Sequence, residues 1–195
     1  MAACGLMMDN FSFVFSLFGL LMGLALAEVI SGFGSAIELR HKVRIGWLSP
    51  LLAVLIAFDL TSFWMTAWQV RGAIPINFLS LGGGLIIFGI YYLIAQLAFP
   101  DDLELWPDLD TYYFAHKKWL LGGVYLCNLL ALAGQEVIGI KPFSDPKIWY
   151  ALTAFTVGMA GAIFLPGKRT NLAFLLYQIA LYPLLAILGI MGAGE

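Results

Sequence analysis

Six apolar runs follow one another along the chain, and short polar connections separate them. A helix that crosses the hydrocarbon core of a bilayer needs about 20 mostly apolar residues. The connections contain residues that end helices, such as Pro100 and Pro166-Gly167. The pattern predicts an all-α fold, a polytopic integral membrane helical bundle of about six transmembrane helices, as one transmembrane domain over residues 1–195. The expected spans are about residues 11–37, 47–70, 77–99, 118–138, 148–165 and 172–190.

Composition indicates that lipid is the solvent for most of the chain. Hydrophobic residues make up 62% of the 195 residues and charged residues 11%, against about 45–50% and about 25% in soluble domains. The formal net charge of −2 provides no basic surface for nucleic acid. We therefore expect the lipid bilayer as a partner, and no nucleic acid.

The basic residues of the connections are distributed unevenly between the two sides of the predicted bundle. Cytoplasmic connections of membrane proteins carry an excess of Lys and Arg. The side reached at the end of the first span has seven basic residues, which are Arg40, Lys42, Arg44, Lys117, Lys118, Lys168 and Arg169. The other side has three, which are Arg71, Lys141 and Lys147. This asymmetry predicts non-cytoplasmic termini, in a plasma membrane or a bacterial inner membrane.

The connection from Pro100 to Lys117 is the longest and mixes acidic side chains with leucines and aromatic rings. Such a composition is typical of a segment that lies flat on the membrane surface. Asp110 or Thr111 is expected to cap a helix that leads into the fourth span. We interpret this stretch as an interfacial cytoplasmic segment, and the alternative interpretation is a gate or a docking site.

Two acidic residues lie well inside predicted spans, Glu28 in the first and Asp59 in the second. An ionisable residue at this depth is costly, so it is a functional candidate by default. A short connection joins the two helices, which we expect to be antiparallel neighbours. No Lys or Arg lies mid-span to neutralise either acid. The pair is therefore the leading candidate for a site that binds and releases a cation or a proton.

Polar residues extend from each acid along one helix face. Ser31, Ser35 and Glu38 follow Glu28 at spacings of three, seven and ten residues, which keeps them on one face. Asp59 is followed at the same spacings by Ser62, Thr66 and Gln69. The first stripe runs toward the predicted cytoplasmic side and the second toward the opposite side. If the stripes share a cavity, they form two polar half-paths that meet near the middle of the membrane.

Other spans supply polar residues that could meet these acids. Asn128 in the fourth span is expected to line the ion or proton pathway together with Ser31, Ser35, Ser62 and Thr66. The possible partners are Gln69, Gln96, Gln135, Gln178 and Tyr182. A purely structural interpretation is available, because small hydroxyl residues are common where membrane helices pack. A buried acid can also be protonated and hydrogen-bonded to a neighbour.

Recognisable catalytic and cofactor chemistry is sparse. The sequence contains no nucleotide-binding glycine loop, nucleophile elbow or zinc-protease motif. His41 and His116 lie outside the predicted spans, where contact with lipid headgroups explains them. Cys4 and Cys127 are too few for a cysteine metal site. We therefore expect no metal site, find no indication that the protein is an enzyme, and leave the identity of any cofactor open.

Three functional hypotheses follow. The leading one is a small transporter or channel for protons or a small cation that uses the intramembrane carboxylates. A six-helix bundle has little room for a wide pore, so this hypothesis includes a homo-oligomer. The alternative is a non-catalytic structural or assembly subunit of a larger membrane complex. The third is a membrane-embedded enzyme or cofactor-binding protein in which Glu28 and Asp59 act as acid and base.

Overall fold

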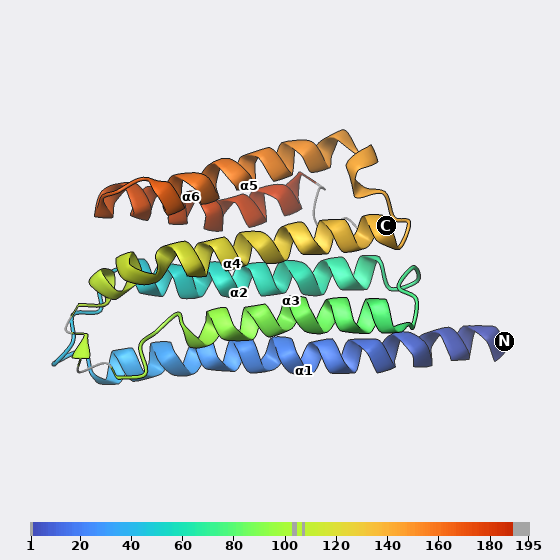
Figure 1. Ribbon diagram of the computed structural model, residues 1–195, viewed down its shortest axis with the longest axis horizontal. Coiled ribbons are helices and arrows are strands. Elements are labelled where there is room, and N and C mark those ends of the chain that lie inside the picture. Colours follow the sequence, from blue (N-terminus) through green and yellow to red (C-terminus); the bar gives the residue numbers. More distant parts are fainter. Residues whose placement is uncertain (1, 103–104, 107, 189–195) are drawn as a thin grey trace.

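The computed structural model describes residues 2–102, 105–106 and 108–188, which form a bundle of roughly parallel and antiparallel helices (Figure 1). Six of the helices are long and apolar enough to cross a membrane. They are α1 (Ala2–Glu38), α2 (Leu48–Gln69), α3 (Phe78–Gln96), α4 (Leu109–Val137), α5 (Pro146–Phe164) and α6 (Lys168–Ile187), and the short 3₁₀ helix η2 (Pro142–Ser144) precedes α5. The predicted fold class, a helical bundle of an integral membrane protein, is confirmed.

The bundle has two distinct ends, which Figure 1 shows on the left and the right. The α1–α2, α3–α4 and α5–α6 connections lie together at one end, which we call the basic end because it holds most of the Lys and Arg residues. The first residue of α1, the last residue of α6 and the other two connections lie at the opposite end, which we call the terminal end. Tryptophan side chains are exposed toward both ends, namely Trp47 and Trp119 at the basic end and Trp64, Trp68 and Trp149 at the terminal end.

The fourth helix begins nearer to the start of the chain than the sequence indicated. It starts at Leu109, ahead of the span expected from about residue 118 and two or three positions before the starts that a cap at Asp110 or Thr111 would give. Its N-cap is Asp108, whose carboxylate accepts a 2.9 Å hydrogen bond from the backbone N–H of Asp110. The early start has a packing reason, because Leu109 and Tyr113 are fully buried between helices. Residues 109–117 of the expected interfacial segment are therefore the first turns of α4. Residues 103, 104 and 107 of that expected segment lie outside the described residues.

Helix α2 occupies the centre of the bundle. Within the most apolar stretch of each helix, 44% of the residues of α2 are buried, compared with 22–28% in the other five. It contacts α1, α4 and α6, while α3 packs between α1 and α4, and α5 packs against α4 and α6. A polar side chain on the inward face of α2 is consequently held away from lipid by several neighbours.

Candidate functional site

The carboxylate of Asp59 lies at the centre of the bundle and is fully buried. Asp59 sits near the midpoint of α2, and its hydrogen-bond donors come from three other helices. Tyr182 of α6 donates to Oδ1 at 2.6 Å. Asn128 of α4 donates through Nδ2 to Oδ2 at 2.9 Å and to Oδ1 at 3.2 Å, and the Tyr91 hydroxyl of α3 donates to Oδ2. Four helices therefore meet at one carboxylate.

Local hydrogen bonds orient the donors around Asp59. Nδ2 of Asn128 also donates to the carbonyl oxygen of Val124, one turn earlier in α4, at 3.1 Å. The hydroxyl of Ser62 donates to the backbone carbonyl oxygen of Asp59 at 2.7 Å. Oδ1 accepts from Tyr182 and Oδ2 accepts from Tyr91, and Nδ2 of Asn128 lies within hydrogen-bond distance of both oxygen atoms. Among the described residues, the hydrogen bonds to the Asp59 side chain all come from neutral groups, so they leave its charge uncompensated.

A cavity of about 190 Å³ reaches the Asp59 site from the terminal end. It lies between α2, α4, α5 and α6, and its wall includes Gln69, the last residue of α2. Its polar lining consists of Ser62, Thr66, Gln69, Asn128, Gln135 and Tyr182. Two of these, Asn128 and Tyr182, also bond to Asp59. The cavity is large enough for several water molecules, and it ends at the donors that hold the carboxylate.

In the opposite half of the bundle, α2, α4 and α6 pack against one another mainly through apolar side chains. Between Asp59 and the basic end, α2, α4 and α6 are packed through fully or almost fully buried residues, which are Leu48, Leu52, Leu55, Ile56, Leu120, Leu121, Val124 and Leu175. The polar cavity and the larger apolar cavity described below both lie toward the terminal end. The polar cavity therefore approaches Asp59 from the terminal end, and packed side chains separate Asp59 from the basic end.

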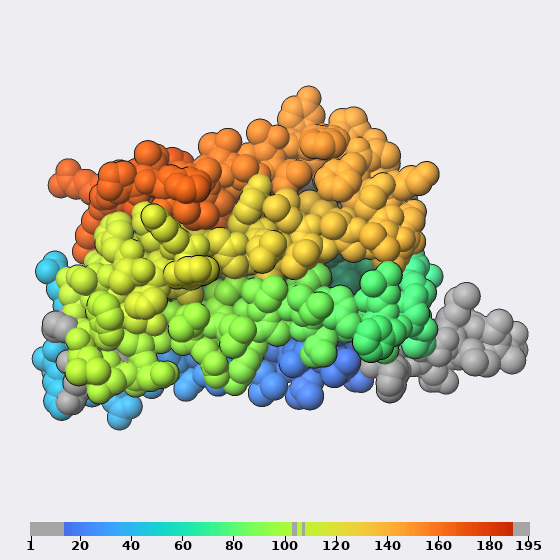
Figure 2. Space-filling model, in the orientation of Figure 1, coloured from blue at the N-terminus to red at the C-terminus, as the bar shows by residue number. Residues whose placement is uncertain are grey.

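A second cavity, of about 300 Å³, lies between α2, α3 and α4 toward the terminal end. Figure 2 shows a hollow between α3 and α4 on this half of the molecule. Its lining is mostly apolar, and Thr66 and Gln135 line both this cavity and the first one. These two residues therefore stand between the polar cavity and the apolar hollow.

Glu28 and its stripe do not join Asp59, which corrects the expectation of two meeting half-paths. Glu28 is half-buried, and Oε1 accepts a 3.4 Å hydrogen bond from the hydroxyl of Tyr92 in α3. Ser31 and Ser35 are exposed. The physical reason is the rotation of α1, which buries the face that carries Ala25 and Val29. Glu28 lies at the edge of that face, and both serines lie beyond it.

The other polar candidates fall into separate groups. Gln69 and Gln135 line the polar cavity. Gln96 is exposed and donates to the hydroxyl of Tyr92 at 3.0 Å, so it belongs with Glu28. Gln178 is fully buried, but its Nε2 donates to the carbonyl oxygen of Phe155 in α5 at 2.9 Å and not to Asp59. Of the five possible partners, Tyr182 alone bonds to an acid directly.

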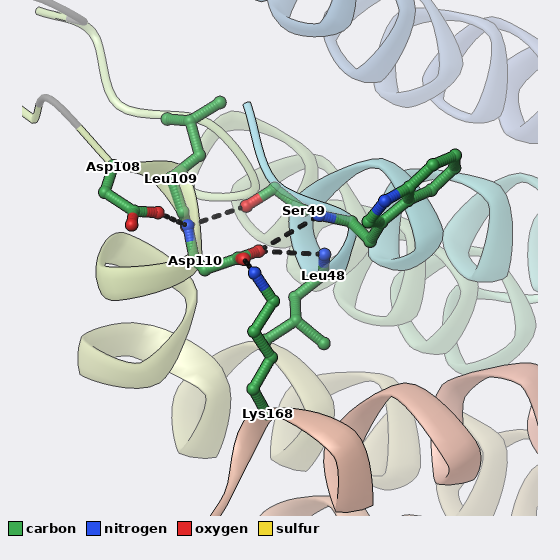
Figure 3. Close-up of polar contacts among 7 residues, drawn as sticks. Leu48, Ser49, Asp108, Leu109, Asp110 and Lys168 are labelled. Atoms are coloured by element: carbon green, nitrogen blue, oxygen red, sulfur yellow. Dashed lines mark hydrogen bonds and ion pairs between the residues drawn. The ribbon is translucent and has the colours of Figure 1, made fainter. Parts of the chain in front are cut away.

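A second buried carboxylate, Asp110, joins three helices at the basic end (Figure 3). Oδ1 accepts hydrogen bonds from the backbone N–H groups of Trp47 and Leu48 at 3.2 and 3.0 Å, and thereby caps the start of α2. Oδ2 forms an ion pair with Lys168 at the start of α6. Asp110 itself belongs to the first turn of α4. Its expected role as a cap of the fourth span is therefore wrong, since it caps the second helix instead.

A glycine makes room for this contact. Gly46 has φ of +65°, and the Asp110 carboxylate occupies the place where a Cβ atom on Gly46 would be. Any other residue would meet both the backbone strain and the collision. Two further hydrogen bonds connect the starts of α2 and α4. The backbone N–H of Leu109 donates to the carbonyl oxygen of Arg44 at 3.0 Å, and the hydroxyl of Ser49 donates to the carbonyl oxygen of Leu109 at 3.1 Å.

Lys117 is a third buried ionisable residue, although from the sequence it counted only as a basic residue of a connection. Its Nζ donates to the carbonyl oxygens of Ala162 and Leu165 at the end of α5, at 2.8 and 2.9 Å, and to Oδ1 of Asn171 at 3.0 Å. The last carbonyl groups of a helix lack partners within the helix and carry partial negative charge. Lys117 therefore caps α5, and Tyr113 adds a 3.1 Å bond to Asn171.

Tyr91 is the member of the Asp59 site that was not predicted from the sequence. Tyr91 shares the buried face of α3 with Phe88 and Ile94, three residues away on either side. This spacing of three residues, visible in the sequence, could have predicted that Tyr91 faces the interior of the bundle. Within the described part of the chain, no cluster of three His, Cys, Asp or Glu residues could hold a metal ion.

Comparison of the chain with protein-family models, with curated proteins and with solved structures finds no match. The geometry of the Asp59 site and its cavity is therefore the basis for assigning a function.

Proposed function

We propose that the protein is a small membrane carrier for protons or a small cation, and that Asp59 is the residue that binds and releases the ion. The observation that carries the proposal is a fully buried carboxylate, surrounded by neutral donors, at the inner end of a one-sided polar cavity. Burial of an isolated charge is costly. A function that requires a carboxylate at mid-depth explains why an acid occupies this position.

The charge of the site supports a cationic ligand. Because the donors are neutral, the site has a net charge of −1 when Asp59 is ionised and becomes neutral when a proton or a monovalent cation binds. The neutral form is the one that a low-dielectric interior favours. Occupancy thus determines whether α2, α3, α4 and α6 surround a charge, and this difference can shift an equilibrium between two conformations.

One-sided access favours a carrier over an open pore. The cavity connects the terminal end with Asn128 and Tyr182, and buried leucines separate Asp59 from the basic end. Release toward the basic end requires α2, α4 and α6 to separate where Asp110 and Lys168 join them. With the orientation predicted from the basic residues, the cavity faces away from the cytoplasm.

The remaining hypotheses have less support from the geometry. The donors around Asp59 all belong to one chain, so the pathway does not need the homo-oligomer that a small bundle suggested. The enzyme hypothesis used Glu28 and Asp59 as acid and base, and these residues have different hydrogen-bond partners. The subunit hypothesis would need a surface for a partner protein. The exposed apolar side chains do not identify one, because such side chains are also expected against lipid.

Reconstitution into liposomes tests the proposal. The purified protein should dissipate an imposed pH gradient or carry a monovalent cation, and Asp59→Asn should remove this flux while the protein stays folded. Glu136→Gln is the matched control, because Glu136 is an exposed acid near the end of α4. If Asp59→Asn retained the flux of the unaltered protein, Asp59 would not be the exchange site.

A further inference from the structure

We infer that the ion is the proton, and that the hydroxyl of Tyr182 relays it between the cavity and Asp59. The inference rests on the proposed function and specifies its substrate. It is carried by the position of Tyr182, which both lines the polar cavity and bonds to Oδ1 of Asp59 at 2.6 Å. Asp59 is fully buried and does not line the cavity itself.

The groups around Asp59 suit a proton better than a metal cation. A metal cation is bound by oxygen lone pairs that replace its hydration shell. Around Asp59, the two tyrosine hydroxyls and the Asn128 amide direct O–H and N–H groups at the carboxylate. Their polar hydrogens would repel a cation placed among them.

Backbone oxygen atoms near the site also have donors already. The carbonyl oxygen of Asp59 accepts from Ser62, and that of Val124 accepts from Asn128. Helix α2 continues without interruption from Leu48 to Gln69, so no unwound segment exposes further carbonyl groups beside Asp59. A metal cation would have to displace the existing donors, whereas a proton can bind by exchange along the hydrogen bonds already present.

The relay step balances with one proton in and one proton forwarded. A hydronium ion in the cavity donates a proton to Oη of Tyr182 while the phenolic O–H bond breaks and its proton bonds to Oδ1 of Asp59. Tyr182 remains a neutral phenol, Asp59 becomes a neutral carboxylic acid, and a water molecule remains in the cavity. The reverse sequence returns the proton. Asn128 also touches both the cavity and the carboxylate, but an amide N–H does not exchange in this way, so Asn128 acts as a positioning residue.

Tyr91 has a different role. Its side chain is fully buried and does not line either cavity, and its hydroxyl donates to Oδ2, the oxygen atom away from Tyr182. It holds the carboxylate in place while Oδ1 takes up the proton. Tyr91 is therefore also a positioning residue, and its loss should alter the pH dependence of transport without closing the route through Tyr182.

The test uses liposomes that contain the whole protein, a pH-sensitive dye inside and, in parallel samples, a sodium- or potassium-sensitive dye. The variant is Tyr182→Phe, which keeps the ring and removes the hydroxyl. The matched control is Tyr177→Phe, because Tyr177 lies on the same helix, is exposed, and bonds to the carbonyl oxygen of Ala154 at 3.1 Å. A second variant, Tyr182→Gln, keeps a donor for Asp59 but cannot relay a proton.

We expect the unaltered protein and Tyr177→Phe to carry protons at the same rate, and neither to carry sodium or potassium above protein-free liposomes. Tyr182→Phe should slow the proton flux at least about tenfold, equal to about 1.4 kcal/mol in the barrier. Tyr182→Gln should be similarly slow, and thermal unfolding of both variants should show a folded protein.

The outcomes separate the inference from the proposed function. An undiminished proton flux in folded Tyr182→Phe or Tyr182→Gln would overturn the relay. Sodium or potassium flux without proton flux would overturn the choice of ion and leave Asp59 as a cation site. A folded, unaltered protein that carries none of these ions would overturn the proposed function as well.

Discussion

The hydroxyl of Tyr182 lies 2.6 Å from Oδ1 of Asp59, although the two residues are 123 positions apart in the chain. The same two helices, α6 and α2, are also connected at the basic end, where Lys168 pairs with the carboxylate that caps α2. Polar contacts therefore join these two helices at two depths in the bundle, and substitutions at each depth can be tested separately.

Asp59→Asn and Tyr182→Phe should not be additive in their effects on the free energy of unfolding. Tyr182→Phe removes the hydrogen bond between them, and Asp59→Asn weakens it, because an amide oxygen still accepts from Tyr182 but carries no charge. The second substitution therefore costs less once the first is present, and the coupling should be about 0.5–1.5 kcal/mol. Asp59→Asn combined with Glu28→Gln should be additive within about 0.5 kcal/mol, because the two acids share no hydrogen-bond partner. Denaturant unfolding in detergent measures both cycles. Equal coupling in the two pairs would contradict this arrangement.

Asn128→Leu should destabilise the protein by about 1–3 kcal/mol, because it leaves the buried Asp59 carboxylate with fewer donors. Gln96→Leu removes an exposed amide and should cost less than about 0.5 kcal/mol. Thermal unfolding, followed by tryptophan fluorescence, compares the two variants. A cost for Asn128→Leu no larger than that for Gln96→Leu would indicate that Asn128 does not hold the carboxylate.

Water should reach the interior from the terminal end alone. In protein whose native cysteines are replaced by serine, Thr66→Cys should react with a membrane-impermeant thiol reagent added at the terminal end, because Thr66 lines the polar cavity. Leu55→Cys should not react from either side, because Leu55 is fully buried in the closed half. Right-side-out and inverted vesicles distinguish the two sides. Labelling of Leu55→Cys from the basic end would show that this half is open to water.

Asp110→Ala should destabilise the protein more than Lys168→Ala. Lys168 is partly exposed, so its ion pair contributes about 0–1 kcal/mol. Asp110 also accepts hydrogen bonds from the first N–H groups of α2, and loss of such a cap costs about 0.5–2 kcal/mol in addition. Unfolding at low and high salt measures both contributions, and salt should reduce only the part that Lys168 supplies. Equal losses for the two variants would argue against the capping role.

Lys117→Met should destabilise the protein by about 1.5–3 kcal/mol, because it removes a charged donor from three oxygen atoms at the α5–α6 junction. Lys118→Met is the matched control, since Lys118 is the exposed neighbour. Its effect should be within about 0.5 kcal/mol of zero. Limited proteolysis near residues 165–167 should also become faster in Lys117→Met alone. If both variants behaved alike, Lys117 would not be a structural cap.

The six-helix fold follows from the sequence because hydropathy and run length determine it. An apolar run that crosses a bilayer can form only a helix or a strand of a closed barrel. The runs in this chain have the length of membrane-spanning helices, about 20 residues, and are too long for barrel strands. The start of α4 was harder to predict from the sequence, because Asp108, Asp110 and Thr111 are all residue types that can cap a helix. The choice depended on contacts with Arg44 and Leu48, more than 60 positions away.

The candidate site was predicted in part for a similar reason. Asp59 stood out because an acid in a span is costly, and Asn128 and Tyr182 were among the polar residues inside other spans. The rotation of each helix about its axis determines which of these polar residues come into contact, and this rotation is determined by packing against the neighbouring helices. For this reason Glu28 accepts a hydrogen bond from Tyr92, whereas Asp59 accepts one from Tyr91, one position earlier in α3. No periodicity within α1 alone distinguishes these outcomes.

The one-sided cavity has a consequence for membrane voltage. Water that fills the cavity would keep the electric potential near Asn128 and Tyr182 close to that of the solution at the terminal end, so the transmembrane field would fall mainly across the closed half. From Asp59 to Leu48 this half is about 16 Å thick at about 1.5 Å per residue. Proton uptake at Asp59 from the cavity would therefore respond little to voltage. The step past Leu55 and Leu52 would carry nearly all of the dependence, about 2.3 kcal/mol for each charge per 100 mV.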